Sequence, residues 1–192
     1  MMCSGDKPVF SQNGLVTTIA WGLGGKITYA LEGSIFVAGA AIQWLRDEMK
    51  LIEASADSEY MAQKVNDTNG CYVVPAFTGL GAPYWDEKAT ASISGITRTT
   101  GKAEVVKAAL DCIAYQITDL VRAMEQDTGL QIAELRVDGG PTRNAYLMQF
   151  QSNIADAGVL VPDSEELSAI GPAYAAGLQL GVWDESIFGK LN

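Results

Sequence analysis

Near the end of the chain lies a junction that limits the possible folds, where an extended run stops at two glycines and a helix follows. The run Leu135-Arg136-Val137-Asp138 precedes Gly139-Gly140, and a helix is predicted over residues 144–155. Glycine lets the backbone pass close to a ligand because it has no Cβ. A helix beginning there directs unpaired N–H groups and the positive end of its dipole toward that ligand. The junction therefore predicts a nucleotide site, although plain tight turns also use this pattern.

A glycine followed four residues later by a carboxamide occurs twice. Asn144 follows Gly140 at a spacing that places both on one helix face, where the amide offers a donor and an acceptor. Gly39 and Gln43 repeat this spacing inside a predicted helix. A glycine in the middle of a helix costs roughly 0.5–1 kcal/mol relative to alanine, so it usually has a packing or ligand reason. Close helix–sheet packing with Gln43 in solvent is the alternative interpretation.

The order of the predicted elements indicates an α/β fold. Alternating apolar residues around a Gly22-Leu23-Gly24-Gly25 turn predict a β-hairpin, and apolar residues spaced by three or four predict a long helix. The predicted strands cover residues 15–21, 27–31, 72–74, 91–94, 135–137 and 159–161, and the predicted helices cover residues 35–49, 58–65, 103–126, 144–155 and 169–180. This order predicts a single domain over residues 1–192, with a mixed sheet that starts with an antiparallel hairpin and carries helices on both faces.

Composition excludes several classes of function. The net charge of −10 argues against non-specific binding to nucleic acid or to an anionic membrane, since both need clusters of Lys and Arg. The absence of His rules out a Ser-His-Asp or Cys-His triad and a His-ligated zinc site in this chain. Cys3, Cys71 and Cys112 form no CxxC pair, so we expect reduced thiols in a cytoplasmic protein. No apolar run reaches transmembrane length.

The sequence leaves two interpretations open for each of two carboxylates, Asp138 and Asp86. Asp138 is placed either to hold Mg²⁺ through water or to cap the turn. Asp86 follows Tyr84-Trp85, whose aromatic rings we expect to be buried, and it is either an acid or base or, more commonly in such a loop, a turn acceptor. Pro172 is expected in the first turn of the last helix, where its missing N–H is tolerated.

Several long segments resemble the C-terminal domain of the FGGY carbohydrate kinase family, and its glycerol kinase branch in particular. The resemblance covers nearly the whole chain and is carried by segments 29–33, 42–47, 74–85, 91–111, 136–140 and 147–151. It implies an actin-like, ribonuclease-H-like ATPase lobe, with ATP and Mg²⁺ in a cleft between two such lobes. The adenosine-contacting positions of the family match Gly39, Gln43, Gly140 and Asn144. The chain departs from the family at Pro141-Thr142-Arg143, where small residues are common, and at Pro172.

The resemblance also implies a division of labour. The catalytic Asp of the family, its glycerol-binding residues and its main phosphate loops belong to an N-terminal lobe, and no residue of this chain matches them. We therefore expect no catalytic residue and no metal ligand here, and no kinase activity from the chain alone. The expected partners are ATP or ADP and the missing N-terminal lobe, with glycerol bound only in the complete enzyme. The uncovered apolar surface of a separate lobe predicts a homo-oligomer.

Two other functions fit the same residues. The chain belongs either to a related sugar kinase, such as a xylulose kinase, or to a non-catalytic nucleotide-binding or oligomerisation module. The Ala82-Pro83-Tyr84-Trp85 segment favours the glycerol branch over other sugars.

Overall fold

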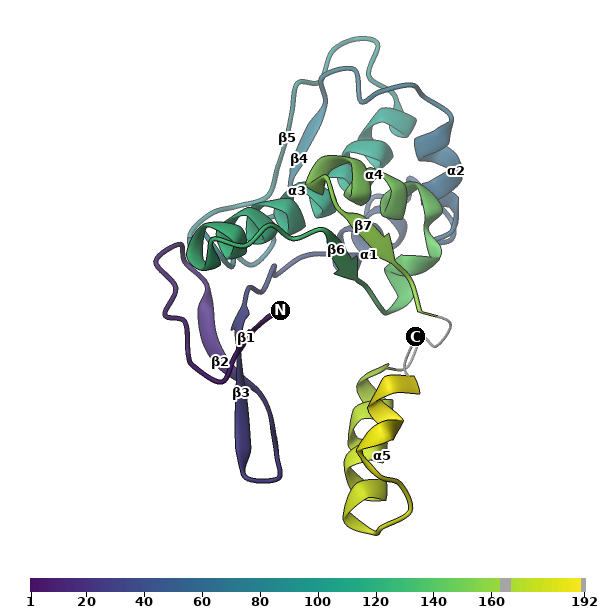
Figure 1. Ribbon diagram of the computed structural model, residues 1–192. Coiled ribbons are helices and arrows are strands. Elements are labelled where there is room, and N and C mark those ends of the chain that lie inside the picture. The colour runs from purple at the N-terminus through teal and green to yellow at the C-terminus, as the bar shows by residue number, and fades with distance from the viewer. Residues whose placement is uncertain (163–166, 191–192) are drawn as a thin grey trace.

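The fold is organised around the long helix α3, which passes through the middle of the molecule (Figure 1). The computed structural model describes residues 1–162 and 167–190. The strands are β1 (Met2–Gly5), β2 (Val16–Leu23), β3 (Lys26–Glu32), β4 (Tyr72–Val74), β5 (Ser92–Ser94), β6 (Glu134–Arg136) and β7 (Gly158–Leu160). The helices are α1 (Gly39–Asp47), α2 (Asp57–Gln63), α3 (Lys102–Thr128), α4 (Ala145–Ala155) and α5 (Leu167–Gln179), with short 3₁₀ turns η1 (Gly140–Arg143) and η2 (Glu185–Lys190).

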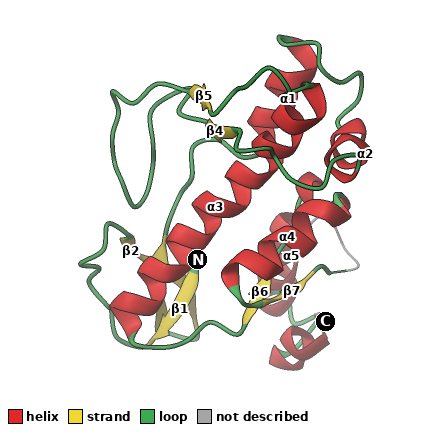
Figure 2. Ribbon diagram, turned by 90° about the horizontal axis from the view of Figure 1, so that it is seen from above, coloured by secondary structure: helices red, strands yellow, loops and turns green. Residues whose placement is uncertain are grey.

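The sequence of α3 defines both of its ends and its buried face. Glu104 accepts a hydrogen bond from the Gly101 backbone N–H at 2.9 Å, and Gly129 ends the helix in the left-handed region with φ +69°. The buried side includes the predicted apolar positions Val106, Leu110, Ile113, Leu120 and Met124. Helices α1, α2 and α4 and strand β4 all contact α3 (Figure 2). Within the described part of the chain, no helix is long and apolar enough to cross a membrane.

The α/β class and the hairpin-first order are confirmed, but the strands pair as three small sheets. Strands β1, β3 and β2 form an antiparallel sheet, β4 pairs with β5, and β6 runs parallel to β7 with Leu135 opposite Val159. The expected single mixed sheet is not formed by the described strands, because the three-residue strands β4 to β7 each find only one hydrogen-bonded neighbour. Strand β1 was not predicted, since four residues that end at a glycine show no clear alternation of apolar and polar side chains.

Two helices, α1 and α5, begin more than one residue away from their predicted starts. Helix α1 begins at Gly39 instead of residue 35, because the preceding residues are held by tertiary contacts. The Phe36 ring packs edge-on against Trp85, and the Val37 carbonyl accepts a hydrogen bond from Gln116 at 3.2 Å. Helix α5 begins at Leu167, so Pro172 lies inside the helix, and the expected first-turn position is wrong. A proline there removes one intrahelical hydrogen bond.

A buried polar cluster joins α3 to its neighbours α2 and α4. Lys107 donates to the Ala62 carbonyl near the end of α2 at 3.0 Å, and its ammonium group lies 4.2 Å from the centre of the Tyr146 ring of α4. The Tyr146 hydroxyl donates to Asp111 at 2.6 Å. Burial raises the pKa of the Asp111 carboxyl, while the Tyr146 hydrogen bond and the Lys107 charge oppose that shift. These contacts satisfy polar groups that would be costly to bury alone.

We expect Tyr146→Phe to lower the free energy of unfolding by about 1.5–3 kcal/mol, because it leaves the 4% exposed Asp111 without its hydroxyl donor. Tyr72→Phe is the matched control, since the Tyr72 side chain is exposed. Urea denaturation followed by circular dichroism measures both variants. Equal stability of the two variants would contradict this role of the Tyr146 hydroxyl.

Candidate functional site

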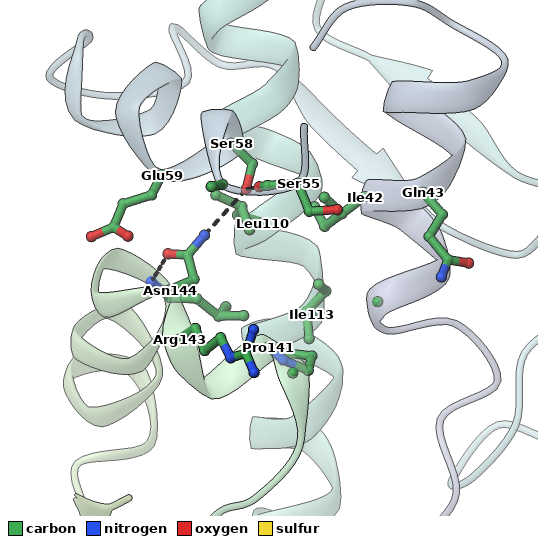
Figure 3. Close-up of a pocket in the computed structure, with 14 residues that line it drawn as sticks. Ile42, Gln43, Ser55, Ser58, Glu59, Leu110, Ile113, Pro141, Arg143 and Asn144 are labelled. Carbon is green, nitrogen blue, oxygen red and sulfur yellow. Dashed lines mark hydrogen bonds between the residues drawn. The ribbon is translucent and has the colours of Figure 1, made fainter. Parts of the chain in front are cut away.

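The four residues singled out by the sequence line one cavity of about 400 Å³. Gly39 and Gln43 come from α1, while Gly140 and Asn144 come from the turn before α4 (Figure 3). Gln43 lies on the opposite side of the cavity from Asn144 (Figure 3). The structure therefore brings together two segments that are far apart in the sequence.

Ten further residues line the cavity, and most were not anticipated from the sequence. The apolar ones are Ile42, Ala56, Leu110, Ile113, Pro141 and Leu147, and the polar ones are Ser55, Ser58, Glu59 and Arg143. Four of them come from α2 and the segment just before it, where no glycine or motif signals a site. Leu110 and Ile113 were predicted as core positions of the long helix, and they also line the cavity.

Gly39 is the first residue of α1 and not a residue in the middle of a helix, as its sequence context had predicted. A Cβ added at Gly39 would meet only the Pro141 side chain, at 3.8 Å, which is ordinary van der Waals contact. The close helix–sheet packing proposed in the alternative interpretation is therefore wrong, whereas its other part is confirmed, because the Gln43 side chain is exposed. Because Gly39 lines the cavity and the space at its Cβ position is open, a ligand can approach the backbone closely there.

Gly140 and Asn144 do not share one helix face, because the chain between them is a 3₁₀ turn. Asn144 has extended backbone angles and is the N-cap of α4, with its Oδ1 accepting from the Leu147 N–H at 2.9 Å. Gly139 has φ +88°, so the conformational need for glycine falls there. A Cβ at Gly140 would meet no atom within 4 Å. The two residues line the same cavity, although they do not share the predicted helix face.

Asp138 and Asp86 lie outside the cavity lining. Asp138 is exposed and lies two residues beyond the end of β6. Asp86 accepts hydrogen bonds from the backbone N–H groups of Lys88 and Ala89, at 2.9 and 3.1 Å, which confirms its prediction as a turn acceptor. Among residues 1–162 and 167–190, no three His, Cys, Asp or Glu side chains lie close enough together to hold a metal ion.

The loop that carries Tyr84 and Trp85 is held by hydrogen bonds from these two side chains, which are not buried. Tyr84 and Trp85 are 54% and 49% exposed, so their predicted burial is wrong. The Trp85 indole donates to the Gly14 carbonyl at 2.6 Å, and the Tyr84 hydroxyl donates to Asp119 at 2.6 Å. The hydrogen bond to Asp119 raises the pKa of Tyr84 to about 12. These two bonds fix the loop to the hairpin region and to α3.

Several known proteins of similar sequence are glycerol kinases. The chain is 59% identical over 184 residues to a glycerol kinase of Agathobacter rectalis, and 57% identical over 183 residues to one of Carboxydothermus hydrogenoformans. The alignments cover 96% and 95% of this chain but only 37% of each relative. The chain thus spans little more than a third of the length of these curated relatives.

Solved structures of kinases share the fold of this chain. The Plasmodium falciparum glycerol kinase, solved with ADP, superposes with a TM-score of 0.86 at 39% identity over 95% of this chain and 37% of that one. The xylulose kinase of Lactobacillus acidophilus superposes with a TM-score of 0.80 at 20% identity over 94% of this chain and 36% of that one, a likeness of fold alone. Residues 1–180 match the C-terminal domain of the FGGY family of carbohydrate kinases. The chain belongs to this family.

Proposed function

We propose that this chain is the C-terminal nucleotide-binding lobe of an ATP-dependent glycerol kinase, which phosphorylates glycerol to glycerol 3-phosphate in the complete enzyme. The observation that carries the proposal is the single cavity shared by Gly39, Gln43, Gly140 and Asn144. The identity to glycerol kinases and the ADP in the Plasmodium falciparum structure support a nucleotide as its ligand.

The chemistry of the cavity fits the nucleoside part of ATP. Ile42, Leu110 and Ile113 offer an apolar surface to a flat base, while Gln43 and Asn144 offer carboxamides for hydrogen bonding. The open spaces at Gly39 and Gly140 leave room for close approach of the ligand. We assign no catalytic residue to this chain.

Mg²⁺ would accompany the nucleotide, held through its phosphates and water. The described side chains offer no cluster of three potential ligands, so they do not form a dedicated metal site of their own. When bound, the ion neutralises charge on the phosphates during phosphoryl transfer. The residues of this chain contribute by positioning the nucleotide, which is the main requirement of such a reaction.

Glycerol is favoured over other sugars as the acceptor of the complete enzyme. The relatives at 54–59% identity are glycerol kinases, whereas the xylulose kinase structures are 18–21% identical. We also infer a cytoplasmic location, which the three free cysteines support. A purely non-catalytic nucleotide-binding module remains the alternative that the activity test below addresses.

We expect Gly140→Leu to weaken ADP binding at least tenfold, because the new side chain occupies the space that Gly140 leaves open. The free energy of unfolding should change by less than about 0.5 kcal/mol, since no protein atom lies in that space. Gly171→Leu is the matched control, a glycine with equally open space but outside the cavity. Titration calorimetry and NMR titration measure the dissociation constants. Unchanged ADP affinity in Gly140→Leu would refute the assignment.

We expect the purified 192-residue chain to form no glycerol 3-phosphate from ATP and glycerol, because no acceptor-binding residue is assigned to it. Adding a separately produced N-terminal lobe of a glycerol kinase relative should restore measurable turnover. A coupled assay for ADP release, with product identified by mass spectrometry, measures both. Turnover by the chain alone at ordinary kinase rates, about 1–100 s⁻¹, would contradict the assignment of acceptor binding and catalysis to the N-terminal lobe.

We further propose that the isolated chain self-associates through the β2–β3 hairpin. Ile19, Trp21 and Ile27 are each about half exposed on that hairpin. Such apolar surface favours association despite the net charge of −10. Sedimentation velocity should show concentration-dependent association that Trp21→Glu reduces, while Leu130→Glu, at an exposed leucine outside the hairpin, leaves it unchanged. A monomer at every concentration would exclude the proposed association.

A further inference from the structure

The Asn144 side chain is held by two neighbours that each accept only one orientation of its amide. On one side, Oδ1 accepts from the Leu147 backbone N–H at 2.9 Å. On the other side, Nδ2 donates to the Ser58 Oγ at 3.2 Å (Figure 3). A backbone N–H is only a donor, so the oxygen must face Leu147.

Ser58 requires the same orientation of the Asn144 amide because its own hydroxyl hydrogen is already used in another hydrogen bond. Its Oγ lies 2.6 Å from the Ser55 carbonyl, which is only an acceptor, so Ser58 donates there. Toward Asn144 the Ser58 Oγ is then an acceptor and requires the amide nitrogen. Ser58 is 1% exposed, so water cannot replace either bond. Rotating the amide by 180° would lose both hydrogen bonds of Asn144.

We infer that Ser58 is a positioning residue that fixes Asn144 as a hydrogen-bond donor to the ligand. One N–H of the Asn144 amide is used by Ser58, and the other forms no hydrogen bond within the described part of the chain. The ligand group that meets this nitrogen must therefore be an acceptor, such as a ring nitrogen or a hydroxyl oxygen. This inference rests on the proposed nucleotide function of the cavity.

Ser58→Ala should raise the dissociation constant for ADP about five- to tenfold, the effect of one lost hydrogen bond. Ser152→Ala is the matched control, because the Ser152 hydroxyl makes a similar bond of 2.8 Å to the Ala157 carbonyl at the far end of α4. Ser58→Thr, which retains the hydroxyl, should recover part of the affinity. NMR titration of the purified chain with ADP measures constants into the millimolar range.

A double-mutant cycle separates positioning from a general loss of structure. Asn144→Asp keeps an oxygen to cap α4 but removes the donor, so it should weaken ADP binding by itself. If Ser58 acts through Asn144, adding Ser58→Ala in the Asn144→Asp background should change the ADP constant less than twofold. Fully additive effects would overturn the inference, as would unchanged affinity in Ser58→Ala.

The orientation can also be measured without a ligand. In the free chain, the side-chain NH₂ signals of Asn144, identified by their loss in Asn144→Asp, should shift and exchange faster with water in Ser58→Ala. Unchanged signals would overturn the inference. Failure of the unmodified chain to bind ADP would instead overturn the proposed function, and this outcome is distinct from the others.

Discussion

The whole arrangement depends on the packing of α1, α2 and α4 against α3. Ile42, Leu110, Ile113 and Leu147 belong to the main hydrophobic core and also line the cavity. The cavity is thus an opening onto the core and not a separate depression in the surface. These four side chains are already almost fully buried, at 7%, 1%, 3% and 3% exposure, so a ligand seated there would mainly add van der Waals contacts with the core.

Hydrogen-bonding groups give this apolar packing its exact spacing. Lys107 ties the end of α2 to the Tyr146 ring of α4, and Ser58 ties α2 to Asn144 at the start of the same helix. Apolar contacts are non-directional, whereas buried hydrogen bonds hold only within narrow ranges of distance and angle. The two links therefore fix the distance between the two helices that form one side of the cavity.

Much of the fold follows from local sequence patterns. The apolar spacing in α3 and the alternation in β2 and β3 predicted these elements to within a few residues, because each pattern matches the periodicity of its own backbone. The predicted start of α1 was wrong because the contacts of Phe36 and Val37 with distant residues override helix propensity. The part of the cavity formed by α2 was missed because the sequence around Ser58 and Glu59 contains no motif, and only the packing of α2 places these two residues at the cavity.

The α/β class, the family and the two glycine–carboxamide pairs could be assigned from the sequence, since they depend on residue type and spacing along the chain. The folded chain was needed to show that the two pairs line one cavity, and that Asn144 is a helix cap with a fixed amide instead of a side chain on a helix face. Both findings depend on contacts among α1, α2, α3 and α4, and such contacts leave no periodic signal in the sequence.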